Sequence, residues 1–467
     1  MVKAYDINSI HEQIVGWDRH VPLLNGKQTR YINFDNAAST PTLKPVLEAL
    51  NEFMQWYSSI HRGTGFKSQL STHLYEQSRE IVRRFFNIRD ENHTIIFGKN
   101  STEAINKLAR RLPLDENDII LTTLMEHHSN DLPWRMRERI DHIGLEADSR
   151  LDMQDLRNKL EIYKGKVRLV SITGASNVSG YINPIPEIAR LVHSHNAELM
   201  VDAAQLAPHR AIDMGDQDDP EHIDYLAFSA HKIYAPFGLG VLIANRDVFK
   251  DGNPDHVGGG TIELVSIDHV LWADVPEQEE AGTPNVAGAI ALGKALQVMQ
   301  EIGMDTIADH EARLTAYTLK KLKQVPGIDI YGSMDENDVH NRLGVIPFNL
   351  QDKSHALVAA ILNFESGIGV RNGCFCAHPY LKHLLGITEE ENEKLEQQII
   401  QHDRSQIPGA VRMSFGMYNH EKEIDFFVDR LHRIARNEFK GKYELNKRTG
   451  EYRPVNYSID FNDFMTL

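Results

Sequence analysis

The sequence predicts an α/β protein whose core is a mostly parallel, buried β-sheet. From about residue 93, short β-branched runs alternate with amphipathic helical segments, which is the order expected of parallel strands joined by helices. The runs are apolar at nearly every position, as in strands that are covered on both faces. The chain has 467 residues, of which 41% are hydrophobic, so it is long enough for a large core.

Six strands can be placed in order, and each is followed by a turn or a helix. Helical patterns follow the first strand, in STEAINKLARRL, and the third, in PIPEIARLVHSH. Sheets of this kind bind ligands in the crevice beyond the carboxyl ends of the strands, so we expect functional residues directly after each strand. The expected strands are residues 93–98, 118–123, 168–173, 198–205, 224–232 and 238–245.

A smaller α+β region is predicted after the sheet. Two helical segments, residues 286–302 and 305–325, end the alternation. The segments GIDIYG, RLGVIPFNL, the helical SHALVAAILNFE and IGVRNG then follow. We expect residues 31–310 to form a large domain, residues 1–30 and 311–436 a small domain, and the polar residues 437–467 a C-terminal extension over the surface.

Charge and composition exclude several classes of partner. The net charge of -16 disfavours nucleic acids and anionic membranes, because both select a basic surface. No apolar run approaches the length of a membrane span, and MVKAYDINSI lacks the pattern of a signal peptide. Two cysteines in so long a chain do not make a disulfide framework, so we expect a reducing, cytoplasmic location.

The segment AFSAHK places Lys232 at the mouth of a strand, beside Ser229 and His231. Partial desolvation lowers the pKa of a lysine, and the neutral amine can then form a Schiff base with a carbonyl. Ser229 and His231 offer hydrogen bonds to an anion. The alternative is a solvated loop lysine, which is the commoner explanation for a single lysine.

The segment MVDAAQ places Asp202 at the end of a very apolar strand. A buried carboxylate needs a cation or strong donors, and the protonated ring nitrogen of pyridoxal phosphate (PLP) is a fitting partner. Gln205, three residues later, could donate to the ring oxygen. A helix N-cap is the alternative role for this aspartate.

Polar residues also follow other strands. Ser101 and Thr102 stand where a strand turns into a helix. The free N–H groups of a helix N-terminus can bind a phosphate, but the same residues are equally a capping signal. His127, beside His128, could stack on a planar cofactor, and Asn177 is a further donor or a turn residue. The sequence shows no cluster of Cys, Asp or Glu that would complete a metal site with the two histidines, so we expect no metal. GGGTIELVSI lacks the spacing of a dinucleotide fingerprint.

Phosphate donors, a stacking histidine, an aspartate and a lysine thus follow successive strands in order. In this order the motifs resemble the class V aminotransferase family of fold-type I PLP enzymes, in particular the cysteine desulfurases and selenocysteine lyases. The resemblance runs from about Tyr31 to Arg433 and implies a mostly parallel seven-stranded sheet. Its motifs are YINFDNAAST, SIHRGTGFKSQLST, GKNSTEAIN, MEHHSNDLPW, GASNVSG, VDAAQ, FSAHK, EAGTPN, VRNGCFCA and VRMSFGMYN.

The resemblance assigns roles to individual residues. It implies that Lys232 holds PLP and moves protons, that Asp202 pairs with the ring nitrogen, and that His127 stacks on the ring. Thr283 would reach the phosphate bound by a second subunit, which implies a homodimer. The remaining cofactor-binding residues would be Gln205 at the ring hydroxyl, Asn177, and Ser101, Thr102, Ser229 and His231 at the phosphate.

The resemblance also implies a substrate and a nucleophile. Cys376 falls on the position of the family's nucleophilic cysteine, which would take sulfur from L-cysteine as a persulfide, release L-alanine and pass the sulfur to an acceptor protein or small molecule. Arg412 and Asn177 would hold the substrate carboxylate. The other residues expected at the substrate site are Asn36, His61, Arg62 and Arg371.

The segment RNGCFCAHP departs from the usual desulfurase pattern. Cys374 and Phe375 stand where two histidines are usual, and Gly-Cys-Phe-Cys resembles the molybdenum cofactor sulfurases. Cys374 could receive the persulfide, form a transient disulfide or fill space, whereas a permanent disulfide between residues two apart would be strained. An insertion near residues 401–410 is also atypical.

Other functions remain open at this stage. A selenocysteine lyase, another C–S lyase or an aminotransferase would use the same PLP site. A redox or metal-binding protein that uses Cys374, Cys376 and His378 would need a fourth ligand from elsewhere.

Overall fold

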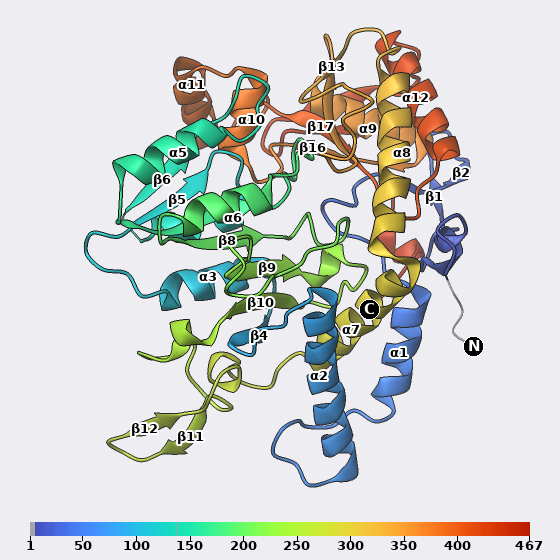
Figure 1. Ribbon diagram of the computed structural model, residues 1–467. Coiled ribbons are helices and arrows are strands. Elements are labelled where there is room, and N and C mark those ends of the chain that lie inside the picture. Colours follow the sequence, from blue (N-terminus) through green and yellow to red (C-terminus); the bar gives the residue numbers. More distant parts are fainter. Residues whose placement is uncertain (1–4, 138) are drawn as a thin grey trace.

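The computed structural model describes residues 5–137 and 139–467, so residues 1–4 of the predicted small-domain segment lie outside it. A seven-stranded sheet occupies the centre of the molecule (Figure 1). Along the sheet the strands are β4 (His93–Gly98), β10 (Gly240–Asn245), β9 (Tyr225–Ser229), β8 (Glu198–Asp202), β7 (Val167–Thr173), β5 (Ile119–Thr123) and β6 (Ile140–Ile143).

The predicted α/β fold with a mostly parallel seven-stranded sheet is confirmed. Strands β5 to β9 pair in parallel, and β10 runs antiparallel to both β4 and β9. The sequence patterns located six of the strands and missed β6. That strand has the sequence IDHI and is half-exposed over three of its four residues at the edge of the sheet, so it lacks the apolar run of a buried strand.

Apolar layers cover both faces of this sheet. Alternate residues of one strand, such as Leu226 and Phe228 of β9, lie in one core, and Tyr225 and Ala227 lie in another. This double burial explains the nearly continuous apolar runs. The helices around the sheet are α1 (Lys44–Met54), α2 (Phe66–Phe85), α3 (Ser101–Arg111), α4 (Leu132–Arg135), α5 (Met153–Ile162), α6 (Ile185–His193) and α7 (Val286–Ile302).

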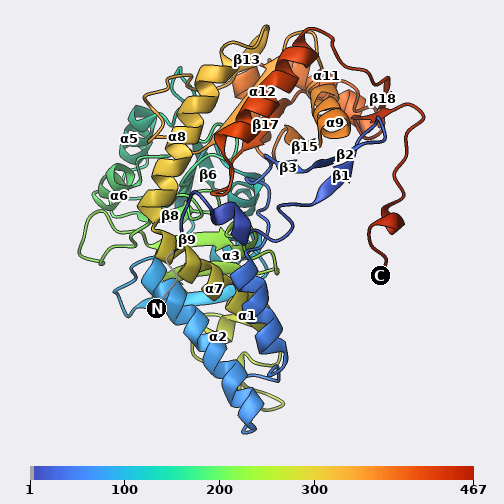
Figure 2. The ribbon, with the colours of Figure 1, turned by 90° about the vertical axis from the view of Figure 1, so that its right-hand side faces the viewer.

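A second sheet, which is antiparallel, lies apart from the central sheet, at the top of the view in Figure 1. Its order is β13 (Ile328–Ile330), β14 (Val345–Leu350), β17 (Ala410–Ser414) and β16 (Arg371–Gly373). Helices α9 (His355–Ser366) and α12 (Glu421–Ala435) pack on it around Phe34, Phe348 and Phe427. The long helix α8 (Met304–Leu322) runs between the two parts (Figure 2). The predicted boundary at residue 310 falls within α8, and the domain division stays a prediction.

Smaller elements complete the chain. The tail, predicted as an extension over the surface, contains a hairpin. The segment just before this hairpin is held on α9, because Lys440 N and Gly441 N donate to the Glu365 carboxylate. Within the described residues, no helix is long and apolar enough to cross a membrane. The remaining elements are β1 (His20–Pro22), β2 (Gln28–Arg30), β3 (Ile32–Asn33), β11 (Ile262–Val265), β12 (Val270–Trp272), β15 (Ile368–Gly369), α10 (His378–Leu385), α11 (Glu389–Ile400), β18 (Tyr443–Asn446) and β19 (Glu451–Pro454).

A buried carboxylate on α8 joins the two parts of the molecule. Glu311 lies 3.0 Å from His209 Nδ1 and 2.6 Å from Arg210 Nη1, and it accepts a hydrogen bond from Gly344 N before β14. Burial alone would raise the pKa of Glu311, but His209, Arg210 and Gly344 together lower it from 4.5 to about 2. This difference corresponds to about 3 kcal/mol of stability at neutral pH.

We predict that Glu311→Gln lowers the midpoint of urea unfolding at pH 7. The folded pKa lies below the unfolded one, so the stabilisation is present above pH 4.5 and disappears as the pH falls toward 2. The gap between variant and wild type should therefore shrink by pH 3. The matched control is Asp425→Asn, which removes an exposed carboxylate paired with Lys321 and should leave the midpoint unchanged. A gap that stays constant from pH 7 to pH 3 would contradict this account.

Candidate active site

A cavity of about 540 Å³ opens at the carboxyl ends of the central strands. Strands β8 and β9 end at its floor with Asp202 and Ser229. The loop before α10, which carries both cysteines, lies on its opposite side. The predicted site residues that line this cavity are Ser101, Thr102, His127, Asn177, Asp202, Gln205, Ser229, His231, Lys232, Arg371, Cys374, Cys376 and Arg412.

Lys232 ends the short 3-10 turn that follows β9. Burial lowers the pKa of its ammonium group from 10.5 to about 8. The carboxylate of Asp202 acts in the opposite direction, and the positive charge of Arg412 adds to the lowering. A substantial fraction of the amine is therefore neutral near pH 8, which is the form that attacks a carbonyl carbon.

Asp202 is the last residue of β8 and is 4% exposed. Burial raises the pKa of its carboxyl group, against the hydrogen bond from Ala204 N and the charge of Lys232. Gln205 Nε2 donates to Ala37 O, whereas its Oε1 is buried without a partner among the described residues. A ligand that brings a cationic N–H and a hydroxyl would satisfy both groups, and a pyridinium ring with its hydroxyl carries both.

The N-terminus of α3 forms another part of the cavity wall. Ser101 N donates to Ser229 Oγ at 2.7 Å, and Thr102 Oγ1 lies 2.7 Å from Ser129 Oγ. Burial and, to a smaller extent, the charge of Lys232 lower the pKa of His231 to about 4, so the ring is neutral at pH 7. Hydroxyl groups gathered at a helix N-terminus, with the positive end of the helix dipole, suit a phosphate group. The residues present therefore fit PLP.

His127 follows β5 as a neutral imidazole. Burial lowers its pKa to about 3, with a further contribution from Lys232. Ser129 N donates to His127 Nδ1 at 3.1 Å, so the neutral ring carries its proton on Nε2. A neutral ring can lie against a planar cofactor without placing a second cation beside Lys232.

Glu126, just before this histidine, was given no role by the sequence patterns. Its Oε1 accepts hydrogen bonds from Thr123 Oγ1 and Thr173 N, and its Oε2 accepts one from Asn130 Nδ2. Burial raises its pKa to about 8 in spite of these bonds. The side chain ties the end of β5 to the end of β7, and so fixes the turn that carries His127. The signal that the sequence offered was the position of Glu126 directly before His127 in MEHHSN.

Arg412 lies on β17 and is 2% exposed. Its Nη2 lies 3.1 Å from Asp35 Oδ1, and its Nη1 donates to Asn177 O at 2.8 Å. Arg371 Nε lies 3.2 Å from the other oxygen of Asp35. Burial lowers the pKa of Arg412 to about 10, which leaves it charged at neutral pH. Asp35 is a second site residue that the sequence patterns missed, although it lies in the motif YINFDNAAST.

The cysteine loop is strained and pinned against the cavity. The backbone φ is +53° at Phe375 and +54° at Cys376, a region that non-glycine residues seldom adopt. Asn177 Nδ2 donates to Phe375 O at 2.7 Å, and His128 N donates to Cys376 O at 2.8 Å. Both bonds come from turns that follow strands of the central sheet. They hold the Cys376 backbone over the cavity.

The two thiols have different surroundings. Cys376 is exposed. Cys374 is partly buried, and its Sγ donates to Pro408 O at 3.0 Å, a carbonyl of the atypical segment 401–410. Burial raises the pKa of Cys374 to about 11. Cys374 is therefore a thiol rather than a thiolate at neutral pH, which fits the role of filling space better than that of a nucleophile.

Four predicted site residues lie outside this cavity in the single chain. Asn36 is buried behind it, where its Nδ2 donates to Ser414 O. His61, Arg62 and Thr283 line a separate cavity of about 560 Å³. Their predicted roles in binding substrate or cofactor stay predictions.

The fold and the strand-end site define an α/β protein built for PLP chemistry. The model of the family described as "Aminotransferase class-V" matches residues 32–427. The chain therefore belongs to the class-V aminotransferase family.

Two relatives are named "Probable cysteine desulfurase". The one from Halalkalibacterium halodurans is 34% identical over 86% of this chain and 92% of its own length. The one from Staphylococcus aureus strain Mu50 is 34% identical over 92% of this chain and 96% of its own.

Solved structures of cysteine desulfurases share the fold. The apo structure from Thermococcus onnurineus NA1 matches with a TM-score of 0.77 and 32% identity, over 94% of this chain and all of that chain. The structure of CsdA from Escherichia coli, in an S-sulfonic acid form, matches with a TM-score of 0.75 and 26% identity over 93% of this chain and all of its own. The likeness of Gly-Cys-Phe-Cys to molybdenum cofactor sulfurases stays a prediction.

We predict that iodoacetamide at pH 8 alkylates Cys376 at least 10-fold faster than Cys374. With a pKa of about 11, about one Cys374 thiol in a thousand is ionised at this pH, and its sulfur is shielded. Mass spectrometry of peptides from a time course measures both rates. Urea-unfolded protein is the control, in which the two rates should converge. Equal rates in the folded protein would contradict the assignment.

Proposed function

We propose that this chain is a PLP-dependent cysteine desulfurase, which converts L-cysteine to L-alanine and holds the sulfur as a persulfide on Cys376. The observation that carries the proposal is that the exposed Cys376 thiol lines the same cavity as Lys232 and Arg412. A transaminase has no need of a thiol at this place. The naming of relatives 34% identical as probable cysteine desulfurases supports the same reaction.

PLP would be held by the residues at the strand ends. Lys232 would bind it covalently, Asp202 would face its ring nitrogen, and His127 would lie on its ring. When bound, PLP supplies an electron sink that stabilises negative charge at the substrate Cα. Gln205 would contact the ring hydroxyl, and the phosphate would be bound by Ser101, Thr102, Ser229 and His231, with Asn177 as a further cofactor contact.

Arg412 would hold the substrate by its carboxylate. Its guanidinium is charged and buried, and its Nε has no hydrogen-bond partner among the described residues. A carboxylate that forms two parallel hydrogen bonds with it would replace part of its contact with Asp35. Asn177 and Arg371 stand beside it at the cavity, and Asn36 supports the strand that carries it.

Proton and sulfur transfer fall to two residues of this chain. Lys232, once freed by the substrate amine, would take the proton from the substrate Cα, because its lowered pKa lets it act as a base near neutral pH. The Cys376 thiolate would attack the substrate sulfur. The S–S bond forms as the C–S bond breaks, and the bonding electrons stay with the substrate Cβ, which is then protonated. Lys232 would return a proton to Cα, and the product is alanine. A thiol acceptor, protein or small molecule, would then take the sulfur.

We further propose a homodimer. His61, Arg62 and Thr283 line their own cavity, apart from Lys232 of the same chain. The proposal places these residues at the active site of a second copy, where Thr283 would reach the phosphate. A mass of two chains in light scattering supports it, and a monomer that is fully active would contradict it.

The organisation proposed for the chain follows from the same assignment. Residues 31–310 would be the PLP-binding domain, residues 1–30 and 311–436 the small domain that carries the cysteine loop, and 437–467 an extension. A cytoplasmic location is proposed because two free thiols persist in a reducing compartment.

We predict that Cys376→Ala lowers alanine formation from L-cysteine by roughly 100-fold or more, because the sulfur acceptor of the first step is lost. The assay measures alanine and sulfide in the presence of a reductant. Cys374→Ala is the matched control and should stay within about threefold of wild type, because its thiol is protonated.

Absorption spectra keep loss of function separate from loss of cofactor. Both cysteine variants should retain the yellow colour of bound PLP, whereas Lys232→Ala should lose it. Alanine formation that is unchanged in Cys376→Ala would exclude the persulfide mechanism and leave the family assignment intact.

A further inference from the structure

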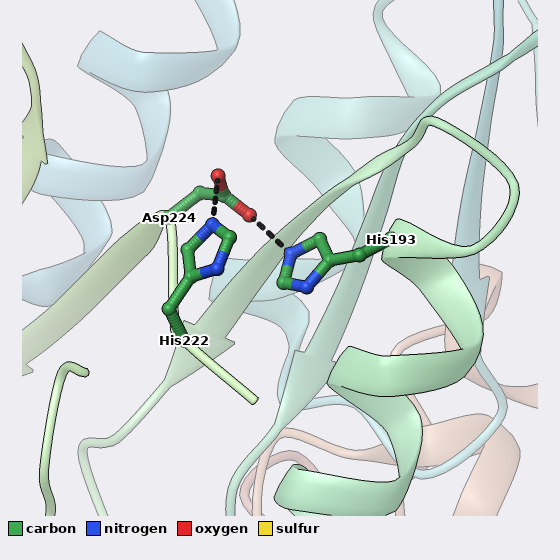
Figure 3. A group of neighbouring side chains, drawn as sticks. All are labelled: His193, His222 and Asp224. Carbon is green, nitrogen blue, oxygen red and sulfur yellow. Dashed lines mark hydrogen bonds and ion pairs between the residues drawn. The ribbon is translucent and has the colours of Figure 1, made fainter. Parts of the chain in front are cut away.

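Two histidines and an aspartate meet where β9 enters the central sheet (Figure 3), at the end of this strand opposite to Lys232. His193 is the last residue of α6, and Asp224 directly precedes β9. His222 lies two residues before Asp224. One ring nitrogen of each histidine and a carboxylate oxygen all lie within 4.8 Å of one another. The sequence patterns predicted no metal site, because these residues are spread over two segments.

The aspartate bridges the two rings. His193 Nε2 lies 3.0 Å from Asp224 Oδ2, and His222 Nε2 lies 3.1 Å from Oδ1. Leu199 N donates to Oδ2 at 2.8 Å and fixes the carboxylate. The carboxylate is thus held in one orientation between the two rings.

The other nitrogen of each ring is already committed. His193 Nδ1 lies 2.8 Å from Pro220 O, and His222 Nδ1 lies 2.6 Å from Asp219 O. A carbonyl oxygen can only accept a hydrogen bond, so each Nδ1 carries a proton. A neutral ring then points the lone pair of its Nε2 at the carboxylate. A carboxylate repels a lone pair that faces it. Either a proton on each Nε2 or one shared cation must therefore lie between the two rings and the carboxylate.

We propose that His193, His222 and Asp224 form a site for one divalent cation of borderline softness, with Zn²⁺ the best suited. Two imidazoles and a carboxylate are established zinc ligands, and solvent would supply the fourth position of a tetrahedron. Histidines that bind metals characteristically donate the other ring N–H to a carbonyl or carboxylate. Both histidines have this arrangement before any metal is bound. The three side chains are 12–15% exposed, which leaves a route for the ion.

A small rearrangement completes the site. The rings are stacked, with centroids 4.0 Å apart and planes 7° from parallel, so a shared cation requires each ring to turn about its Cβ–Cγ bond. Ligand atoms around tetrahedral zinc are roughly 3.3 Å apart, and the three atoms already lie within 4.8 Å.

The role of the site would be structural. A bound ion would tie the end of α6 to the entry of β9, whereas Lys232 follows the other end of that strand. Five residues of strand separate the two ends by about 16 Å. The ion would therefore hold β9 in register without touching the reacting atoms, and this inference does not depend on the proposed reaction.

The test counts metal on the PLP-loaded, full-length protein. A Cys374→Ser/Cys376→Ser background removes binding to thiols. After dialysis against a chelator, Co²⁺ and Zn²⁺ are titrated in separate samples, and the visible absorption of Co²⁺ and the thermal midpoint with Zn²⁺ are recorded. The test variants are His222→Gln and His193→Gln. The matched control is His195→Gln. His195 lies two residues from His193, and the His195 ring contacts Leu191 O and Glu161 outside the site.

The proposal expects one equivalent of Co²⁺ with the absorption of tetrahedral coordination, and a rise of at least ~2 °C in the thermal midpoint with Zn²⁺. Both effects should persist in His195→Gln and disappear in His222→Gln. If His222→Gln does not fold, His193→Gln decides. Equal metal binding by His193→Gln and His195→Gln would overturn the proposal. Stability that depends on pH but not on metal would do the same, because two protons would then fill the space.

Discussion

The burial of Asp202 and Lys232 at the ends of adjacent parallel strands is the constraint on which the site depends. Parallel pairing of β8 with β9 brings both side chains to the same edge of the sheet. There, burial raises the pKa of the acid and lowers the pKa of the amine, so each is pushed toward its neutral form. Such a pair is costly to bury without further polar partners. A cofactor with a cationic ring nitrogen and a carbonyl carbon would satisfy both groups.

The cysteine loop depends on that same edge. Its backbone is held by Asn177 and His128, which follow strands β7 and β5. The strained φ values at Phe375 and Cys376 persist because these bonds define the turn. Pro408, from the segment before β17, binds the Cys374 thiol. Both cysteines line the cavity, but only Cys376 is exposed, and burial keeps the Cys374 thiol protonated.

Much of this site could be predicted from the sequence, because strand ends are visible as the ends of apolar runs. Lys232, Asp202 and His127 were found in this way and lie on one cavity. Asp35 and Glu126 were missed, because their roles come from contacts with Arg412 and with Asn130 and Thr173 that no local pattern reveals. These contacts join separate elements and become visible only in three dimensions.

The same reasoning explains the other differences. Strand β6 is polar and lies at the edge, so its pattern is that of a loop. The tail, expected as an extension over the surface, contains the β18–β19 hairpin, which the sequence patterns did not locate. His61, Arg62 and Thr283 cannot be placed relative to Lys232 of a second chain from one sequence or one chain. Their assignment rests on the family resemblance.

The central claim is that the sulfur of L-cysteine passes to Cys376. Mass spectrometry of the holoenzyme, quenched with an alkylating agent after one turnover without reductant, tests it most directly. We predict that the peptide carrying Cys374 and Cys376 gains the mass of one sulfur atom, and that fragmentation places it on Cys376. Sulfur found on Cys374 alone, or alanine released with no sulfur on either residue, would contradict the account.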